Sequence, residues 1–441
     1  MSNARHFLKP VMRLCGYDIE SAAKLLSTFD GLSQEKKDEW QHDQKWKIFN
    51  YHINNNEFYK TKVKNRSPKL WEKIPIMRKQ DYQQNFNKLL SNGYTKSNVY
   101  LANTSGSSGV PFFFAKNKFA HSMTWALAEN RYDWYKVGLN SKQARYFGRP
   151  LENTSKYFEI IKDALFGRKT MLVFDLSDDV LARHTELFSK VQFKMIYGYT
   201  NSLVLFAKYL IKNNLILKKI CTSLKLCIST SELLSIQDRE IILSGFGVTV
   251  VNEYGVSEAG GIVAFEDLDS DWILSSETQF LEIVDDNESL VSNGNSGKIL
   301  ITDLHNKAMP FIRYEVGDIG MVKRSKNNGK LTLASLTGRT NDLILLPSGK
   351  KSPGLTFYYI SRSILESSGI LKEFIIRQVQ KDKFIFDIKA DRDLTQDEVE
   401  DIKSKMDIYL EPGLRLEINR TEQIRRPASG KQKHFYSEIS D

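Results

Sequence analysis

Cysteine is scarce in this 441-residue chain: there are three, Cys15, Cys221 and Cys227, and no two of them form a Cys-x-x-Cys pair. This spacing suggests neither a disulfide framework nor a zinc cluster. The seven histidines are scattered along the chain, so their spacing indicates no metal centre. A reducing cytoplasm is therefore the expected compartment.

Long apolar runs are also missing. No segment is long enough to cross a bilayer, and Arg5, Lys9 and Arg13 interrupt the N-terminal stretch where a signal peptide needs a hydrophobic core. We therefore expect no transmembrane segment, while peripheral attachment to a membrane stays open. The net charge of +10, from 63 basic and 53 acidic residues, is small for this length. It favours small polyanions or anionic surfaces, and we expect no nucleic-acid partner.

The hydrophobic pattern divides the chain into several parts. Residues 1–98 are mostly polar with helical spacing, which predicts a helical cap. Strand and helix patterns alternate over residues 99–276, which is typical of a parallel sheet flanked by helices. A run of alternating strands over 277–340 predicts a β-rich subdomain. The pattern then restarts as a small α+β domain over 341–441.

The predicted fold class is therefore α/β, with a large N-terminal domain over residues 1–340 and a small C-terminal domain. Ligands of such sheets bind at the carboxyl ends of the strands. Two polar segments follow predicted strands, Ser229–Glu232 after 224–228 and Asn252–Glu258 after 248–251. Both segments are candidates for a ligand site.

The segment Thr104-Ser-Gly-Ser-Ser-Gly-Val-Pro111 is rich in glycine and hydroxyl groups. Apolar runs at Val99–Ala102 and Phe112–Ala115 flank it, which predicts a hairpin with a long loop at its tip. Glycine permits positive φ, and successive N–H groups can bind an anion such as a nucleotide phosphate. The loop lacks the Gly-Lys-Ser/Thr of a Walker A motif. By itself it could also be a surface loop without a ligand. The candidate phosphate-binding residues are Thr104, Ser105, Gly106, Ser107, Ser108 and Gly109.

Four further motifs follow this loop in the order of the chain. They are Tyr254-Gly-Val-Ser-Glu258, Met309-Pro-Phe-Ile-Arg-Tyr-Glu-Val-Gly-Asp318, Gly338-Arg-Thr-Asn-Asp342 and Pro427-Ala-Ser-Gly-Lys431. Together the five motifs resemble the adenylate-forming (acyl-CoA synthetase) superfamily. More narrowly, with Tyr197-Gly-Tyr-Thr-Asn-Ser202, they resemble its phenylacetate–CoA ligase-like branch, which includes members associated with capsular polysaccharide biosynthesis. One such motif is weak, but five in this order, from about residue 40 to the end of the chain, are specific.

The resemblance implies an ATP-dependent ligase in which a carboxylate attacks the α-phosphate of MgATP and forms acyl-AMP and pyrophosphate. The attacking carboxylate is already ionised, so a Ser/His or Cys/His nucleophile is not required, and none is visible in the sequence. The glycine-rich loop would hold the β- and γ-phosphates. Lys431 would neutralise charge on the carboxylate and α-phosphate, and Glu258 would bind Mg²⁺. These two are the predicted catalytic residues.

The resemblance also implies where the nucleotide binds. Tyr254 would lie beside adenine, Asp318 would accept hydrogen bonds from the ribose, and Arg339 would contact ribose or phosphate. Ser257 stands where threonine is common in the family, and the turn before Glu232 lacks the usual glycine. From the residues alone, each also has an ordinary structural interpretation, such as a turn or a surface ion pair. The complete implied set is Ser231, Glu232, Tyr254, Gly255, Ser257, Asp318 and Arg339.

Asn341 occupies the family's hinge position, where aspartate is more usual. The resemblance implies that the C-terminal domain rotates there as a mobile lid before the acyl group passes to a thiol, with CoA as the first choice. A phosphopantetheine carrier or a sugar amine or hydroxyl stays open as acceptor. The acid is expected near Tyr197, Gly198, Tyr199 and Gly260. A nucleotidyl transferase and a non-catalytic nucleotide-binding protein are the alternatives, and the identity of the acid, the pathway and the oligomeric state stay open.

Overall fold

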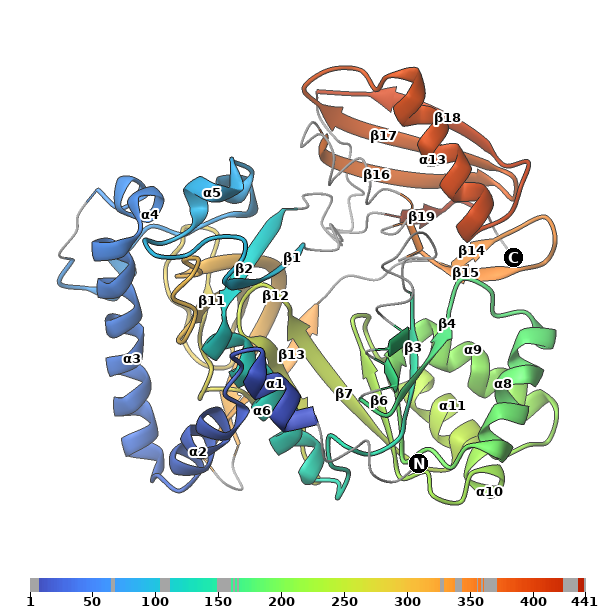
Figure 1. Cartoon of the computed structure of the whole chain (residues 1–441), viewed down its shortest axis with the longest axis horizontal. Helices are drawn as coiled ribbons and strands as arrows, with labels where there is room; N and C mark the ends of the chain where they lie inside the picture. Colours follow the sequence, from blue (N-terminus) through green and yellow to red (C-terminus); the bar gives the residue numbers. More distant parts are fainter. Residues whose placement is uncertain are drawn as a thin grey trace. The chain divides into compact units, whose positions relative to one another are not determined.

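The structure is a computed structural model, and the chain divides into two compact units, which we describe one at a time (Figure 1). Unit 1 comprises Met1–Thr104, Phe112–Leu139 and Glu253–Gly338, and unit 2 comprises Ser105–Pro111, Asn140–Asn252 and Arg339–Asp441. The residues that the structure describes are 8–64, 68–103, 112–148, 160–161, 163–164, 166–325, 329–337, 343–354, 356–357, 360, 371–422 and 435–439.

Unit 1 begins with helices, drawn in blue in Figure 1. Asp18 caps α2 by accepting a hydrogen bond from the Ser21 amide, and Ser33 caps α3 in the same way through Lys36. In the described part of the chain, no helix combines the length and apolarity that a membrane span needs. The helical elements are α1 (Leu8–Leu14), α2 (Ile19–Asp30), α3 (Gln34–Asn55), α4 (Glu57–Lys62), η2 (Trp71–Lys73), η3 (Lys79–Tyr82), α5 (Phe86–Leu89) and α6 (Lys118–Asp133).

The strands of unit 1 form a hairpin and an antiparallel sheet. In the hairpin, β1 (Val99–Asn103) pairs with β2 (Phe113–Asn117), which confirms the two strands predicted beside the glycine-rich loop. The loop itself, residues 104–111, lies outside the described residues. The antiparallel sheet has the order β10 (Gln279–Val284), β11 (Ser296–Asp303), β12 (Tyr314–Arg324), β13 (Leu331–Thr337), β9 (Trp272–Leu274), β8 (Gly261–Glu266) and the second half of β7 (Thr249–Val256).

Unit 2 contains the predicted parallel sheet, in the order β7, β6 (Leu226–Thr230), β5 (Met195–Tyr199), β3 (Gln143–Phe147) and β4 (Arg168–Leu172). Apolar residues on one face of this sheet, including Ala144, Tyr146 and Ile196, share a core with the surrounding helices. Close packing needs a glycine at 245, where a Cβ atom would come within 2.8 Å of the Ala207 backbone. The helices are α8 (Asp178–Lys190), α9 (Thr200–Lys212), α10 (Leu217–Ile220) and α11 (Ile236–Phe246).

The C-terminal part of unit 2 is a small α+β structure, and its apolar core also includes Phe174, which follows β4. Its four-stranded sheet has the order β18 (Arg415–Arg420), β17 (Lys383–Ala390), β16 (Leu371–Gln380) and β19 (Phe435–Ser437), and α13 (Gln396–Tyr409) packs with it. The small hairpin of β14 (Leu343–Leu345) and β15 (Lys351–Pro353) precedes this sheet. These elements agree with the α/β fold class predicted from the sequence, with a separate small α+β part.

One strand differs from its predicted boundary. β7 continues to Val256, so Tyr254 and Gly255 lie within a strand and not in a turn after it, which corrects the prediction of a strand at 248–251. The polar residues after 251 suggested the end of the strand, but pairing with β8 overrides that local preference.

Candidate nucleotide site

Glu258 lies in the turn between β7 and β8 and is 8% exposed. The hydroxyl of Tyr314, the first residue of β12, donates a hydrogen bond of 2.9 Å to Glu258 Oε1. The ring of Tyr314 is buried and meets the rings of Tyr82 and Phe311 edge-on, at centroid distances of 5.6 and 5.3 Å. A fixed phenol therefore orients the carboxylate that the sequence assigns to Mg²⁺.

Tyr254 and Asp318 form a second hydrogen-bonded pair in unit 1. Tyr254 Oη donates to Asp318 Oδ2 at 2.8 Å, and each residue is 8% exposed. Along β12, Tyr314, Val316 and Asp318 alternate on the buried face, so both pairs use the same side of that strand. The structure thus brings together motif residues that are 56 and 64 positions apart in the sequence.

The side chains around Glu258 fit a magnesium ion that is shared with a phosphate. Mg²⁺ is usually held by one or two carboxylates together with water and substrate phosphates. Within the described residues, no group of three or more His, Cys, Asp or Glu side chains could hold a metal ion by itself. Tyr314 engages only one oxygen of Glu258, which leaves the carboxylate able to serve as a single protein ligand.

The turn after β7 contains two other predicted residues, Ser257 and Gly260. Ser257 is exposed, as is Gly255 within β7. Gly260 has a φ of 88°, and a Cβ atom there would lie 2.6 Å from the Gln279 side chain. Glycine is therefore required at 260 by the turn itself, and a contact of Gly260 with the acid stays a prediction.

In unit 2, Glu232 is held by the start of helix α9. Its two carboxylate oxygens accept hydrogen bonds from the Asn201 amide at 2.8 Å and from Asn201 Nδ2 at 3.1 Å. Ser231 has a φ of 69°, in the left-handed region that favours glycine. This backbone conformation explains why the family usually has a glycine in this turn, although the present chain does not. Thr200 Oγ1 donates to the Glu232 carbonyl at 3.1 Å. Adenine contacts of Ser231 and Glu232 stay predictions.

Glu232 makes the stability of unit 2 depend on pH. Burial raises the pKa of Glu232 from 4.5 to about 7, although the hydrogen bonds from Asn201 act against this rise. Between these two values the folded chain binds a proton that the unfolded chain has lost, so the free energy of unfolding falls as pH rises through this window. We expect the parent to lose roughly 2–3 kcal/mol between pH 5 and pH 8 through this group.

Urea unfolding of the parent and of Glu232→Gln at pH 5 and pH 8 measures this effect. Glutamine does not titrate, so the variant should lose less stability than the parent between the two pH values. Equal pH dependence of the two proteins would show that Glu232 is ionised throughout.

Three of the predicted acid-binding residues, Tyr197, Gly198 and Tyr199, lie at the carboxyl end of β5. Tyr197 and Tyr199 are on one face with Arg145 and Phe147 of β3, and the Arg145 guanidinium lies 4.7 Å from the Tyr197 ring centroid. Gly198 faces the other way, where a Cβ atom would come within 2.5 Å of Tyr146 Cβ. Gly198 is thus required by strand packing. The sequence did not single out Arg145, because a lone arginine in a strand carries no spacing signal.

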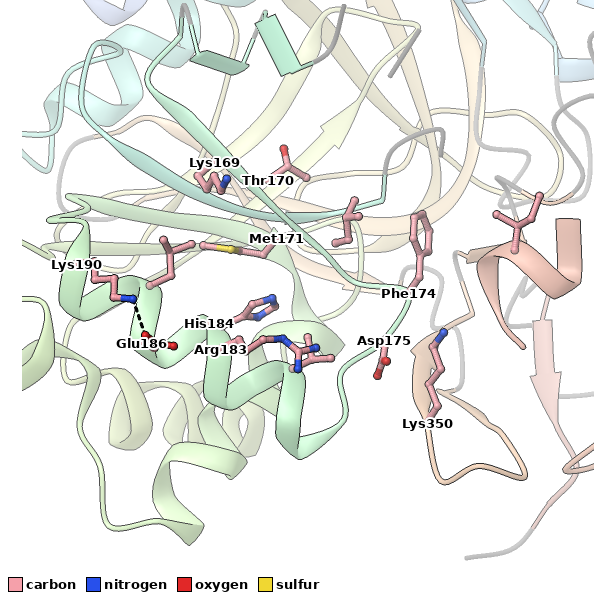
Figure 2. Close-up of a pocket in the computed structure, with 14 residues that line it drawn as sticks. Lys169, Thr170, Met171, Phe174, Asp175, Arg183, His184, Glu186, Lys190 and Lys350 are labelled. Carbon is pink, nitrogen blue, oxygen red and sulfur yellow. Dashed lines mark hydrogen bonds and ion pairs between the residues drawn. The ribbon is translucent and has the colours of Figure 1, made fainter. Parts of the chain in front are cut away.

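A separate cavity of about 630 Å³ lies in unit 2 beside β4 and α8 (Figure 2). Figure 2 shows Lys190 paired with Glu186 at one side and Lys350 at the other. Burial lowers the pKa of His184 to about 4, so this lining imidazole is neutral at pH 7. Among the described residues that line the cavity, none belongs to the five motifs.

Nine predicted site residues belong to segments that the structure does not describe. They lie outside the described residues, and their roles stay predictions: Thr104, Ser105, Gly106, Ser107, Ser108, Gly109, Arg339, Asn341 and Lys431.

No protein-family model and no curated protein sequence matches the chain. Solved structures do match. 2-Hydroxyisobutyryl-CoA ligase, in complex with 2-HIB-AMP and CoA in the thioesterification state, has a TM-score of 0.59 at 15% sequence identity, over 92% of this chain and 91% of that chain. The same ligase with 2-HIB-AMP in the postadenylation state has a TM-score of 0.58 at 15% sequence identity, over 92% of this chain and 90% of that chain.

The chain has the adenylate-forming ligase fold. The match confirms the fold class that the sequence predicts, and it supports the superfamily resemblance at the level of the fold. In this fold β7 and β12, which carry Tyr254 and Asp318, belong to one sheet, and Glu258 lies in the turn that follows β7.

Proposed function

We propose that the protein is an ATP-dependent acid–thiol ligase. It activates a carboxylic acid as acyl-AMP, releases pyrophosphate and transfers the acyl group to a thiol, with CoA as the acceptor. The observation that carries this proposal is the pair of hydrogen bonds, Tyr314–Glu258 and Tyr254–Asp318, which orient two motif carboxylates on neighbouring segments of unit 1. The fold shared with a CoA ligase over 92% of the chain supports it.

The described residues would act by binding and orientation. Tyr254 orients the Asp318 carboxylate through a hydrogen bond, and this carboxylate would accept a hydrogen bond from a ribose hydroxyl. Glu258 would bind Mg²⁺, which neutralises phosphate charge when it is bound. Because the acid arrives as a carboxylate, positioning and charge neutralisation suffice for its attack on the α-phosphate. Lys431 and the loop 104–109 complete this proposal from the sequence.

The proposal extends to the acceptor and the pathway. The similar ligase binds CoA in its complex, and we extend this to the present chain as the first choice over a carrier protein or a sugar amine or hydroxyl. The proposal also includes membership of the phenylacetate–CoA ligase-like branch, a place in polysaccharide or secondary-metabolite biosynthesis, and a cytoplasmic location.

ATP–pyrophosphate exchange with a panel of carboxylic acids tests the proposed function, followed by product masses with and without CoA. Acid-dependent exchange supports adenylation, and an acyl-CoA product identifies the acceptor. If the protein binds nucleotide but no acid supports exchange, the proposed ligase function is wrong and the protein is non-catalytic. If AMP stays attached to an acceptor, the proposed function is wrong and the protein is a nucleotidyl transferase.

Replacing Tyr314 by phenylalanine should weaken the use of magnesium. The variant loses the hydrogen bond that orients Glu258, and loss of a partner that orients a metal ligand typically costs about 10–100-fold in metal affinity or activity. We expect the Mg²⁺ concentration for half-maximal exchange to rise about tenfold.

The matched control is Tyr82→Phe, because Tyr82 donates to the Pro310 carbonyl and not to Glu258. Its magnesium dependence should stay that of the parent. If Tyr314→Phe also keeps the parent's magnesium dependence, Glu258 is not the ligand.

A further inference from the structure

Lys116 is a buried lysine that none of the motifs includes. It lies on β2 and is 2% exposed. The loop after β11 fixes the strand on both sides of it, because Asn306 Nδ2 donates to the Ala115 carbonyl at 2.8 Å and the Lys307 amide donates to Asn117 Oδ1 at 2.8 Å. The loop after β11 therefore holds the backbone in place on both sides of Lys116.

Two carboxylates act electrostatically on Lys116, those of Asp303 and Glu258. Both have other hydrogen-bond donors. Asp303 Oδ1 accepts from the backbone amides of His305 at 2.9 Å and Asn306 at 3.0 Å, and Glu258 Oε1 accepts from Tyr314. Among the described residues, the ammonium of Lys116 makes no hydrogen bond and no ion pair within 4 Å.

A buried ammonium without a hydrogen bond or an ion pair lowers the stability of the folded chain. Removing a charge from water costs several kcal/mol unless hydrogen bonds and close opposite charges compensate. Burial lowers the pKa of Lys116, and the two carboxylates act in the opposite direction. A purely structural lysine would be expected to contact one of these acids directly, as Arg313 contacts Glu282 elsewhere in unit 1.

The charges around Lys116 suit an anion that arrives together with a divalent cation. The cluster holds one ammonium and two carboxylates, so it is negative by itself. A magnesium ion at Glu258 would make it positive, and its natural complement is then a phosphate group bound to the same metal. Lysine suits this role because it is a compact charge with three donors.

We infer that Lys116 binds the terminal phosphates of ATP and holds pyrophosphate until it leaves. This inference rests on the proposed adenylation. Lys116 donates hydrogen bonds to non-bridging oxygens while the bond between the α- and β-phosphates breaks, and it transfers no proton. Chain connectivity supports the role, since β2 directly follows the glycine-rich segment that the sequence assigns to phosphate.

Calorimetric binding of Mg-pyrophosphate and of AMP to the full chain tests this role without any carboxylic acid. Lys116→Met should weaken Mg-pyrophosphate binding about 10–100-fold, the range for losing hydrogen bonds to a charged group. AMP lacks the β- and γ-phosphates, so its affinity should be unchanged. Lys116→Arg keeps the charge and should retain most of the pyrophosphate affinity.

Lys118→Met is the matched control, because Lys118 lies two residues away and donates to the Cys15 carbonyl. It should bind both ligands as the parent does. Parent-like Mg-pyrophosphate binding by Lys116→Met overturns the inference, and so does an equal loss of both ligands, which would reveal a structural role. If Lys116→Met loses only pyrophosphate but no acid supports exchange in the parent, the phosphate site stands and the proposed ligase activity fails.

Discussion

Replacing Arg313 by methionine is expected to lower the free energy of unfolding of unit 1 by about 3–5 kcal/mol, the cost of breaking a buried ion pair from one side. The Arg313 and Glu282 side chains are each 2% exposed, and Arg313 Nε lies 3.2 Å from Glu282 Oε1. Arg313 Nη1 also donates to the carbonyls of Glu72 at 2.9 Å and Ile74 at 2.7 Å. Methionine fills much of the volume but leaves two carbonyls and a carboxylate without this donor.

The consequence for Glu282 is the main source of this loss. Burial raises the pKa of Glu282, while Arg313 and a hydrogen bond from Trp71 Nε1 lower it. Without the guanidinium, the carboxylate must either stay charged in the core or take up a proton. Both outcomes cost stability at neutral pH.

Urea unfolding followed by tryptophan fluorescence measures this effect, since Trp71 belongs to the network. Arg324→Met is the control: Arg324 pairs with Asp38 at 2.8 Å, but these side chains are 41% and 45% exposed. Surface pairs contribute about 0–1 kcal/mol, so this variant should unfold close to the parent. A loss for Arg313→Met as small as that for Arg324→Met would contradict the predicted role of Arg313.

Replacing Lys431 by alanine is expected to reduce ATP–pyrophosphate exchange by about 10²–10³-fold, the usual cost of removing one preorganised group that stabilises developing charge. ATP binding should stay nearly intact, because the glycine-rich loop, Tyr254 and Asp318 are predicted to hold the nucleotide. The resemblance also implies that Lys431 withdraws before thiol transfer. The variant should therefore still convert added acyl-AMP to product.

Lys433→Ala is the matched control, as it removes a lysine from the same C-terminal stretch but leaves Pro427–Lys431 unchanged. It should exchange at close to the parent rate. Exchange at the parent rate by Lys431→Ala would remove that residue from the mechanism.

Local pattern was enough to predict much of the fold. The alternation of strand and helix patterns over residues 99–276 indicated the parallel sheet, and β3, β4, β5 and β6 with α8, α9 and α11 lie in this range. Period-two alternation likewise indicated the antiparallel strands β10, β11 and β13. Such patterns are readable because burial of one face repeats at a fixed interval along the chain.

The errors occurred where tertiary pairing overrides local preference. The polar residues Asn252 and Glu253 suggested the end of a strand, yet Glu253 pairs with Phe265 of β8 and β7 runs on to Val256. The sequence likewise gave no sign that contact with Tyr146 on the neighbouring strand requires glycine at 198, while a contact of Gly198 with the acid stays a prediction. Neither neighbour is visible from local spacing.

By itself, the sequence determined the α/β class, the order of the motifs and which carboxylates and lysines are candidates for nucleotide chemistry. Only the tertiary structure decided that Tyr314 orients Glu258, that Tyr254 holds Asp318 and that Lys116 is buried near Glu258 and Asp303. The physical reason is that periodic burial leaves a repeating signal in the sequence. A hydrogen bond between residues 56 or 64 positions apart arises from strand pairing and leaves none.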